Sequence, residues 1–103
     1  MDATFDDQQS PRQRKKVDQQ ALQSAFMRIP GMKVDAARDL LDLGLDEVYQ
    51  LEGRSPESLF SDLKKLRPET PADRIAFLRL AVYFAETDAP DPRQLHPAAW
   101  TGG

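Results

Sequence analysis

Residues 29–45 have the sequence IPGMKVDAARDLLDLGL, which predicts a sharp corner followed by an amphipathic helix. Pro30 disfavours helical geometry at Ile29, so a preceding helix should end there. Gly31 supplies the unusual backbone angles of the corner. Beyond it, apolar residues recur at three- and four-residue steps until Gly44, which is typical of a left-handed helix cap. The stretch therefore predicts two helices joined by a tight turn.

The helix before the corner is expected to begin near residues 15–18 and to end at Ile29. Its apolar face follows from the helical spacing of Leu22, Ala25, Phe26 and Ile29. The helix after the corner is expected over residues 34–43. Asp35 lies in its first turn, where a carboxylate suits the helix dipole.

Two further helical segments are expected after Gly44. Asp46 should cap a short turn that ends at Gly53. Ser55, with Pro56 at the first helical position, should cap a longer helix that Pro68 closes.

The start of the final helix is predicted by Thr70 as its cap, Pro71 at its first position and Asp73 as a variant of the capping box. Residues 75–85 are apolar on nearly every side, so this helix should be the central element, or else form a dimer seam. Trp100, in the Pro-rich segment that follows, is expected to cover an apolar patch rather than to anchor a partner.

Length and composition indicate one soluble domain. The chain has 103 residues, of which 40% are apolar and 30% charged, and it contains no cysteine. We expect a flexible polar tail at 1–14, a helical domain at 15–86 and a C-terminal extension at 87–103. The apolar run at 75–85 is too short to cross a bilayer, and the acidic start does not resemble a secretory signal, so a cytoplasmic location without membrane contact is predicted.

The net charge of −3 conceals a block pattern. Residues 11–34 carry six basic groups against one acid, and residues 63–85 carry five against two. Residues 35–62 are acidic, with eight acids against two basic groups. A local basic patch could therefore form if the two positive blocks meet, although the overall acidity opposes a polyanion at long range.

The chain offers little catalytic chemistry. His96 is the only histidine and has no Cys or second His with which to share a metal, so we interpret it as a surface residue. Asp35, Asp39 and Asp42 could hold a hard cation, but a solvated row or a pair with Arg38 is the favoured interpretation. A Gly-rich phosphate loop is absent. No enzyme activity, metal or cofactor is predicted.

The corner itself is the best candidate site. A helix N-terminus behind a Gly turn presents unpaired backbone amides, and the helix dipole reinforces them, so a phosphate oxygen can bind there without any base being read. The candidate amides are those of Gly31, Met32, Lys33 and Val34. Nearby positive charge could come from Lys33, Arg28, Arg12, Arg14, Lys15 and Lys16.

At these residues the sequence resembles the helix-hairpin-helix motif: an apolar residue, Pro, Gly, an apolar residue, Gly, three variable positions and Ala. Here the corresponding residues are Ile29 to Ala37. The runs LDLGLDEVYQLEGRSPESLFSDL and DRIAFLRLAVYFAE, followed by a late DP and a Trp, are similar to the small bacterial "pathogenicity locus" helix-hairpin-helix family. The resemblance covers about residues 20–100.

That resemblance implies an all-α fold: about five helices in a compact helix-hairpin-helix (SAM-like) domain, with residues 66–71 as a degenerate second hairpin. It also implies sequence-independent contact with the backbone of double-stranded DNA. The chain departs from the motif at Lys33, which replaces the second Gly. If that position requires a positive φ, the replacement costs about 1 kcal/mol or more. Asp35 would repel a phosphate bound nearby.

Two functions of different class therefore remain. In the first, the corner and the basic N-terminal segment bind nucleic-acid backbone with strong salt dependence and no base preference. In the second, the corner only packs two helices, and the domain is a non-enzymatic module that contacts another protein through its acidic block or its last helix.

Overall fold

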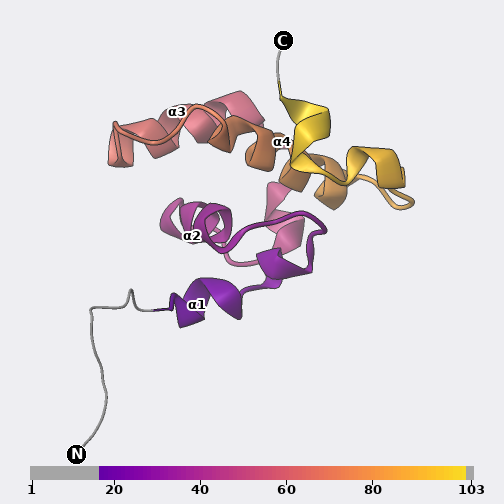
Figure 1. The fold of residues 1–103 in the computed structure, drawn as a ribbon, viewed down its shortest axis with the longest axis horizontal. Helices are drawn as coiled ribbons and strands as arrows, with labels where there is room; N and C mark the ends of the chain where they lie inside the picture. Colours follow the sequence, from indigo (N-terminus) through magenta and orange to yellow (C-terminus); the bar gives the residue numbers. More distant parts are fainter. Residues whose placement is uncertain (1–16, 102–103) are drawn as a thin grey trace, which may run out of the picture.

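The computed structural model describes residues 17–101, and within them every regular element is helical, as predicted (Figure 1). The α-helices are α1 (Gln19–Leu22), α2 (Val34–Asp42), α3 (Pro56–Leu66) and α4 (Arg74–Glu86). Short 3-10 helices are η2 (Ala25–Arg28), η3 (Val48–Leu51), η4 (Pro92–Gln94) and η5 (Pro97–Trp100). The tail expected at 1–14, and with it Arg12, Arg14, Lys15 and Lys16, lies outside the described residues.

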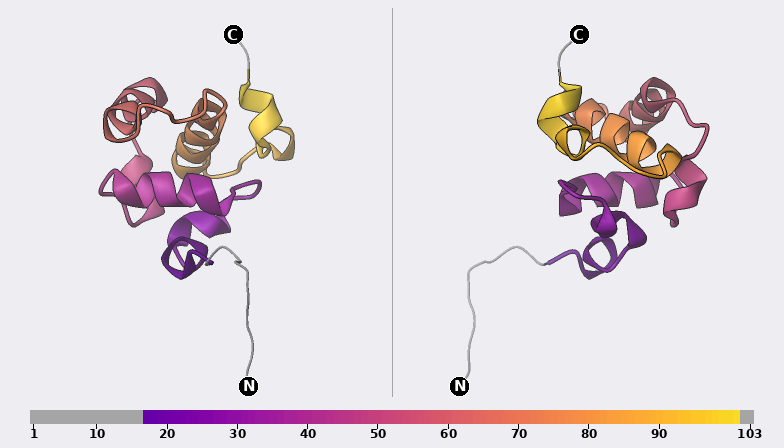
Figure 2. Two further views of the ribbon diagram at one scale, coloured as in Figure 1. Left: turned by 60° about the vertical axis from the view of Figure 1, so that its left-hand side comes forward. Right: turned by 90° about the vertical axis from the view of Figure 1, so that its right-hand side faces the viewer.

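The helices are arranged in tiers around α2 and α4. Figure 2 shows α2 between α1 on one side and the tier of α3, α4 and the C-terminal segment on the other. Helix α4 contacts α2, α3, η3 and η5, so it lies at the centre of the fold. Within residues 17–101, no helix combines the length and the apolar character needed to cross a membrane.

Helix α4 supplies much of the core because it is covered on several sides. Its buried residues are Ala76, Phe77, Leu78, Leu80, Ala81 and Val82. They pack with Phe26, Ile29 and Leu40 from the first half of the chain. The all-round apolar character of α4 is therefore used within the domain, as the central-element interpretation predicted.

The second and third α-helices end and begin where the sequence indicates. Gly44 has a φ of +89°, and its amide donates to Leu41 O at 3.0 Å while the Leu45 amide donates to Leu40 O at 3.1 Å. These two bonds form the Schellman cap that closes α2. Ser55 caps α3 by accepting a hydrogen bond from the Ser58 amide at 3.2 Å.

The first helix is not continuous to Ile29, so that prediction was wrong. Helix α1 ends at Leu22, where the Ser24 hydroxyl donates to Ala21 O at 2.7 Å. A Ser side chain that bonds the backbone in this way competes with helix continuation. The chain resumes as η2, which buries Phe26, but it leaves Leu22 44% exposed rather than on a common apolar face.

Two predicted caps were also wrong. Thr70 does not cap α4, because its hydroxyl donates to Arg67 O at 2.6 Å and the helix begins only at Arg74. The turn at η3 is capped by Glu47 rather than Asp46. Gln50 Oε1 accepts hydrogen bonds from the Glu47 and Asp46 amides, both at 2.8 Å, and completes a capping box one residue later than expected.

Candidate functional site

The corner before α2 is a tight turn of four residues. The Met32 amide donates to Ile29 O at 3.1 Å across Pro30 and Gly31, and Gly31 has a φ of +81°. Pro followed by Gly at the two central positions is typical of a type II turn, which requires a positive φ at the second of them. The glycine is therefore needed for the direction in which α2 begins.

Lys33, which stands where the motif has its second Gly, adopts an ordinary extended conformation. Its φ is −108° and its ψ is 155°, and it is the N-cap residue of α2. Any L-residue adopts these angles without strain. The cost that would follow from a positive φ at this position therefore does not arise, and the side chain adds a positive charge at the helix N-terminus.

Three of the four predicted amides lack an acceptor among residues 17–101. They belong to Gly31, Lys33 and Val34. The fourth, that of Met32, is bonded within the turn, and the Met32 side chain is buried. The open amides lie at the positive end of the α2 dipole, a position that favours an anion.

The N-terminus of α4 lies beside that of α2. Arg74 Nη1 donates to Asp35 O at 3.3 Å, and Lys33 Nζ lies 5.8 Å from the centroid of the Phe77 ring. A cavity of about 410 Å³ is lined by both helix starts, with Gly31 and Lys33 on one side and Asp73 on the other. Two positive helix ends therefore face one small region of the surface.

The C-terminal extension forms the remaining wall of this cavity. His96, Pro97 and Thr101 line it, and His96 Nδ1 accepts a hydrogen bond from the Ala98 amide at 3.1 Å. The histidine thus caps η5 and is exposed, as a surface residue should be.

The side-chain charges around the corner are mixed. Lys33 and Arg28 are exposed and basic, whereas Asp35 and Asp73 are exposed carboxylates of the same region. Full charges of both signs largely offset each other at long range, so the backbone amides are the groups that favour an anion at contact distance. Among residues 17–101, no group of three or more His, Cys, Asp or Glu residues is placed to hold a metal ion.

A buried carboxylate on α2 connects this helix to the end of α3 and to the start of α4. Asp39, only 1% exposed, accepts hydrogen bonds from Arg67 at the end of α3 and from Arg74 at the start of α4. Burial raises the pKa of the Asp39 carboxyl, while the two guanidinium groups oppose that rise. The sequence interpretation, which placed Asp39 in a solvated row, was wrong for this residue. Asp39 follows Ala36 by three residues, which places the two on the same face of the helix, and Ala36 is also buried. This spacing was the one feature of the sequence that could have predicted the burial of Asp39.

The ion pairs continue outward from this carboxylate. Arg67 Nη1 lies 2.5 Å from Asp42 Oδ2, and Arg38 Nη1 lies 3.1 Å from Asp42 Oδ1. Arg38 Nε also pairs with Asp18 Oδ2 at 2.8 Å, which attaches α1 to α2. The hydrogen bond that Arg67 donates to Asp42 raises the pKa of Arg67, and those that Arg38 donates to Asp18 and Asp42 raise the pKa of Arg38. The expected pairing of the acidic row with Arg38 is confirmed for Asp42.

The Asp18 pair predicts a loss of stability in acid. Hydrogen bonds from Arg38 and from the Ala21 amide lower the pKa of Asp18 from 3.8 to about 2. A folded-state pKa below the ordinary value means that the carboxylate stabilises the fold above about pH 4, and that this stabilisation disappears as the pH falls toward 2. Urea unfolding of wild type and Asp18→Asn should therefore differ most above about pH 4, and the difference should shrink as the pH falls toward 2. A difference independent of pH would contradict the prediction.

Comparison with known proteins matches the chain to a protein family. A family model described as "Pathogenicity locus" matches residues 19–101, which is nearly all of the described chain. No curated protein and no solved structure matches significantly.

Proposed function

We propose that this chain, which belongs to the pathogenicity locus family, binds the backbone of double-stranded DNA without regard to base sequence. The observation that supports the proposal is the set of open amides of Gly31, Lys33 and Val34 at the N-terminus of α2. In this interpretation residues 25–42 form a helix-hairpin-helix element, in which η2 takes the place of the last turn of the first helix.

The proposed contact is electrostatic and local. A phosphate oxygen would accept hydrogen bonds from the open amides, and the Lys33 ammonium would add a charge beside it. Arg28, and the basic run of Arg12, Arg14, Lys15 and Lys16, would extend the contact to neighbouring phosphates. No base edge is read in such a contact. The role that we propose is binding without catalysis, in the cytoplasm.

The proposal predicts strong salt dependence. Each phosphate neutralised by the protein contributes a slope of about −0.9 to the dependence of log K on log salt concentration. Fluorescence anisotropy of a short labelled duplex at several salt concentrations gives this slope. Duplexes of unrelated sequence should give the same affinity.

Lys33→Glu should weaken duplex binding roughly tenfold at low salt. It should also reduce the slope of log K against log salt concentration by about 0.9, the contribution of one phosphate contact. The matched control is Arg54→Glu, which changes the net charge by the same amount. Arg54 follows Gly53, whose amide bonds Glu86 at the far end of the 13-residue helix α4. That helix is about 20 Å long. The control should therefore retain most of the affinity of the wild type.

Two results of this experiment would contradict the proposal. One is that wild type shows no salt-sensitive binding even at low ionic strength. The other is that Lys33→Glu and Arg54→Glu weaken binding equally, because the effect would then come from net charge rather than from the corner. Thermal unfolding of both variants shows whether the fold is retained.

A further inference from the structure

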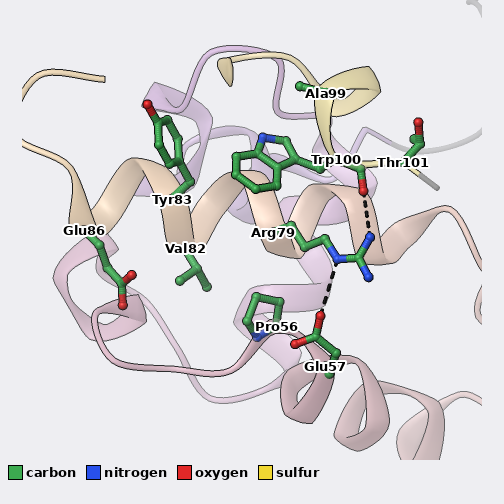
Figure 3. Close-up of a pocket in the computed structure, with 9 residues that line it drawn as sticks. All are labelled: Pro56, Glu57, Arg79, Val82, Tyr83, Glu86, Ala99, Trp100 and Thr101. Carbon is green, nitrogen blue, oxygen red and sulfur yellow. Dashed lines mark hydrogen bonds and ion pairs between the residues drawn. The ribbon is translucent and has the colours of Figure 1, made fainter. Parts of the chain in front are cut away.

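A second surface feature lies on the other side of η5 and has different chemistry. It is a groove of about 680 Å³ between the first turn of α3, one side of α4 and η5 (Figure 3). This volume lies within the range of cavities that hold a small ligand or a peptide side chain.

The two walls of the groove are held in place by Arg79 of α4. Its Nη1 donates to Trp100 O at 2.8 Å, and its Nε lies 3.4 Å from Glu57 Oε2 of α3 (Figure 3). The guanidinium therefore connects the α3 side of the groove to the η5 side. Because these contacts come from three separate elements, the groove is formed before any ligand enters.

An aromatic pair lines the groove. The rings of Tyr83 and Trp100 have centroids 5.3 Å apart at an interplanar angle of 44°. Trp100 Nε1 donates to Gln94 O at 2.8 Å, and the Tyr83 hydroxyl accepts from the Asp91 amide at 2.8 Å. With their polar atoms bonded to the protein, the two rings offer mainly π surface to a ligand.

The ionised groups of the groove favour a cation. Glu57 and Glu86 are both exposed, and they outnumber the one basic group, Arg79, which already contacts Glu57. Glu86 Oε2 accepts from the Gly53 amide at 2.6 Å, and its other oxygen has no partner among residues 17–101. Carboxylates beside aromatic rings attract cations and repel phosphate, so this groove differs chemically from the corner.

We propose that the groove binds an arginine side chain of a peptide segment in a partner protein. A planar guanidinium stacks on aromatic rings and pairs with a carboxylate through two parallel hydrogen bonds, which an ammonium cannot do. Glu86 would accept those bonds while one of the two rings packs against the plane, because rings tilted by 44° cannot both lie parallel to it. The charge of the groove selects this occupant, and the proposal does not depend on DNA binding at the corner.

The test uses Trp100, the only tryptophan of the chain, as its reporter. The full-length protein is titrated with a blocked pentapeptide that carries one central arginine between alanines, and Trp fluorescence is followed. The control peptide carries citrulline, which has nearly the same shape without the charge. We expect saturable binding of the arginine peptide that is roughly tenfold tighter than that of the citrulline peptide.

Variants locate the binding. Glu86→Gln can still accept the hydrogen bond from the Gly53 amide, and it should lower the affinity for the arginine peptide about threefold. Glu69→Gln removes an exposed carboxylate in the connection between α3 and α4, outside the lining of the groove, and should leave the affinity unchanged. The proposal is overturned if Trp fluorescence shows no saturable change, if both peptides bind equally, or if Glu86→Gln and Glu69→Gln behave alike. Thermal unfolding of each variant confirms that the groove is still formed.

Discussion

Replacing Asp39 with alanine should lower the free energy of unfolding by about 3 kcal/mol, because it leaves two arginines without their shared buried partner. The carboxylate is buried and bonds both Arg67 and Arg74. Arg67 is 35% exposed, so water can partly replace the lost pair, which keeps the expected loss at the lower end for a broken buried pair. Urea unfolding of wild type and variant at neutral pH measures the loss.

The matched control is Asp62→Ala, which removes an exposed partner of Lys65 at 3.9 Å. Such surface pairs contribute about 0 to 1 kcal/mol. For a domain of this size, the difference between the two variants corresponds to a melting temperature lower by at least 10 °C or so for Asp39→Ala. Similar losses for the two aspartates would show that the buried carboxylate does not hold the helices together.

Gly31→Val should destabilise the fold by about 3 kcal/mol, from two additive causes. Gly31 has a φ of +81°, which a β-branched residue adopts only with strain. An added Cβ would also lie 2.9 Å from Pro97 Cδ and 3.5 Å from Leu80 Cδ2. The added side chain would therefore displace η5 as well as distort the corner.

Gly44→Val separates these two causes. Gly44 has a similar φ of +89°, but no heavy atom lies within 4 Å of an added Cβ. Gly44→Val should therefore lower the free energy of unfolding by only about 1 to 2 kcal/mol, the cost of the backbone strain. Thermal or urea unfolding of both variants gives the comparison. If Gly31→Val cost no more than Gly44→Val, the close packing of Pro97 on the corner would be contradicted.

The parts of the fold that were predicted correctly are those that depend on residues close together in the sequence. The cap of α3 needs only Ser55 and Pro56, and the end of α2 needs only Gly44 and Leu45. The all-round apolar pattern of α4 likewise predicted its central place. In each case the hydrogen bond or the burial follows from a spacing of a few residues along the chain.

The errors arose where a side chain had an alternative partner. Both Ser24 and Thr70 can cap a helix or bond a preceding carbonyl, and in both the second outcome occurs. Propensity does not distinguish the two, since the same hydroxyl serves either purpose. The break after α1 and the late start of α4 therefore could not be predicted from residue type alone.

The candidate site was predicted in part. The spacing around Gly31 indicated the corner and its amides, but the neighbours of the corner come from distant segments. Asp39 bonds arginines 28 and 35 residues away, and Pro97 packs on Gly31 from the other end of the chain. The departure at Lys33 also needed the structure, because only its φ in the folded chain shows that the replacement is unstrained.

The most direct test of DNA-backbone binding at the corner is an amide chemical-shift titration of isotope-labelled full-length protein with a short duplex at low salt. The account predicts that the largest shifts occur at Gly31, Lys33 and Val34, whose amides would donate to phosphate. The amide of Arg54, at the far end of α4, should change little. Binding that shifts other surfaces and leaves these three amides unaffected would contradict the proposal.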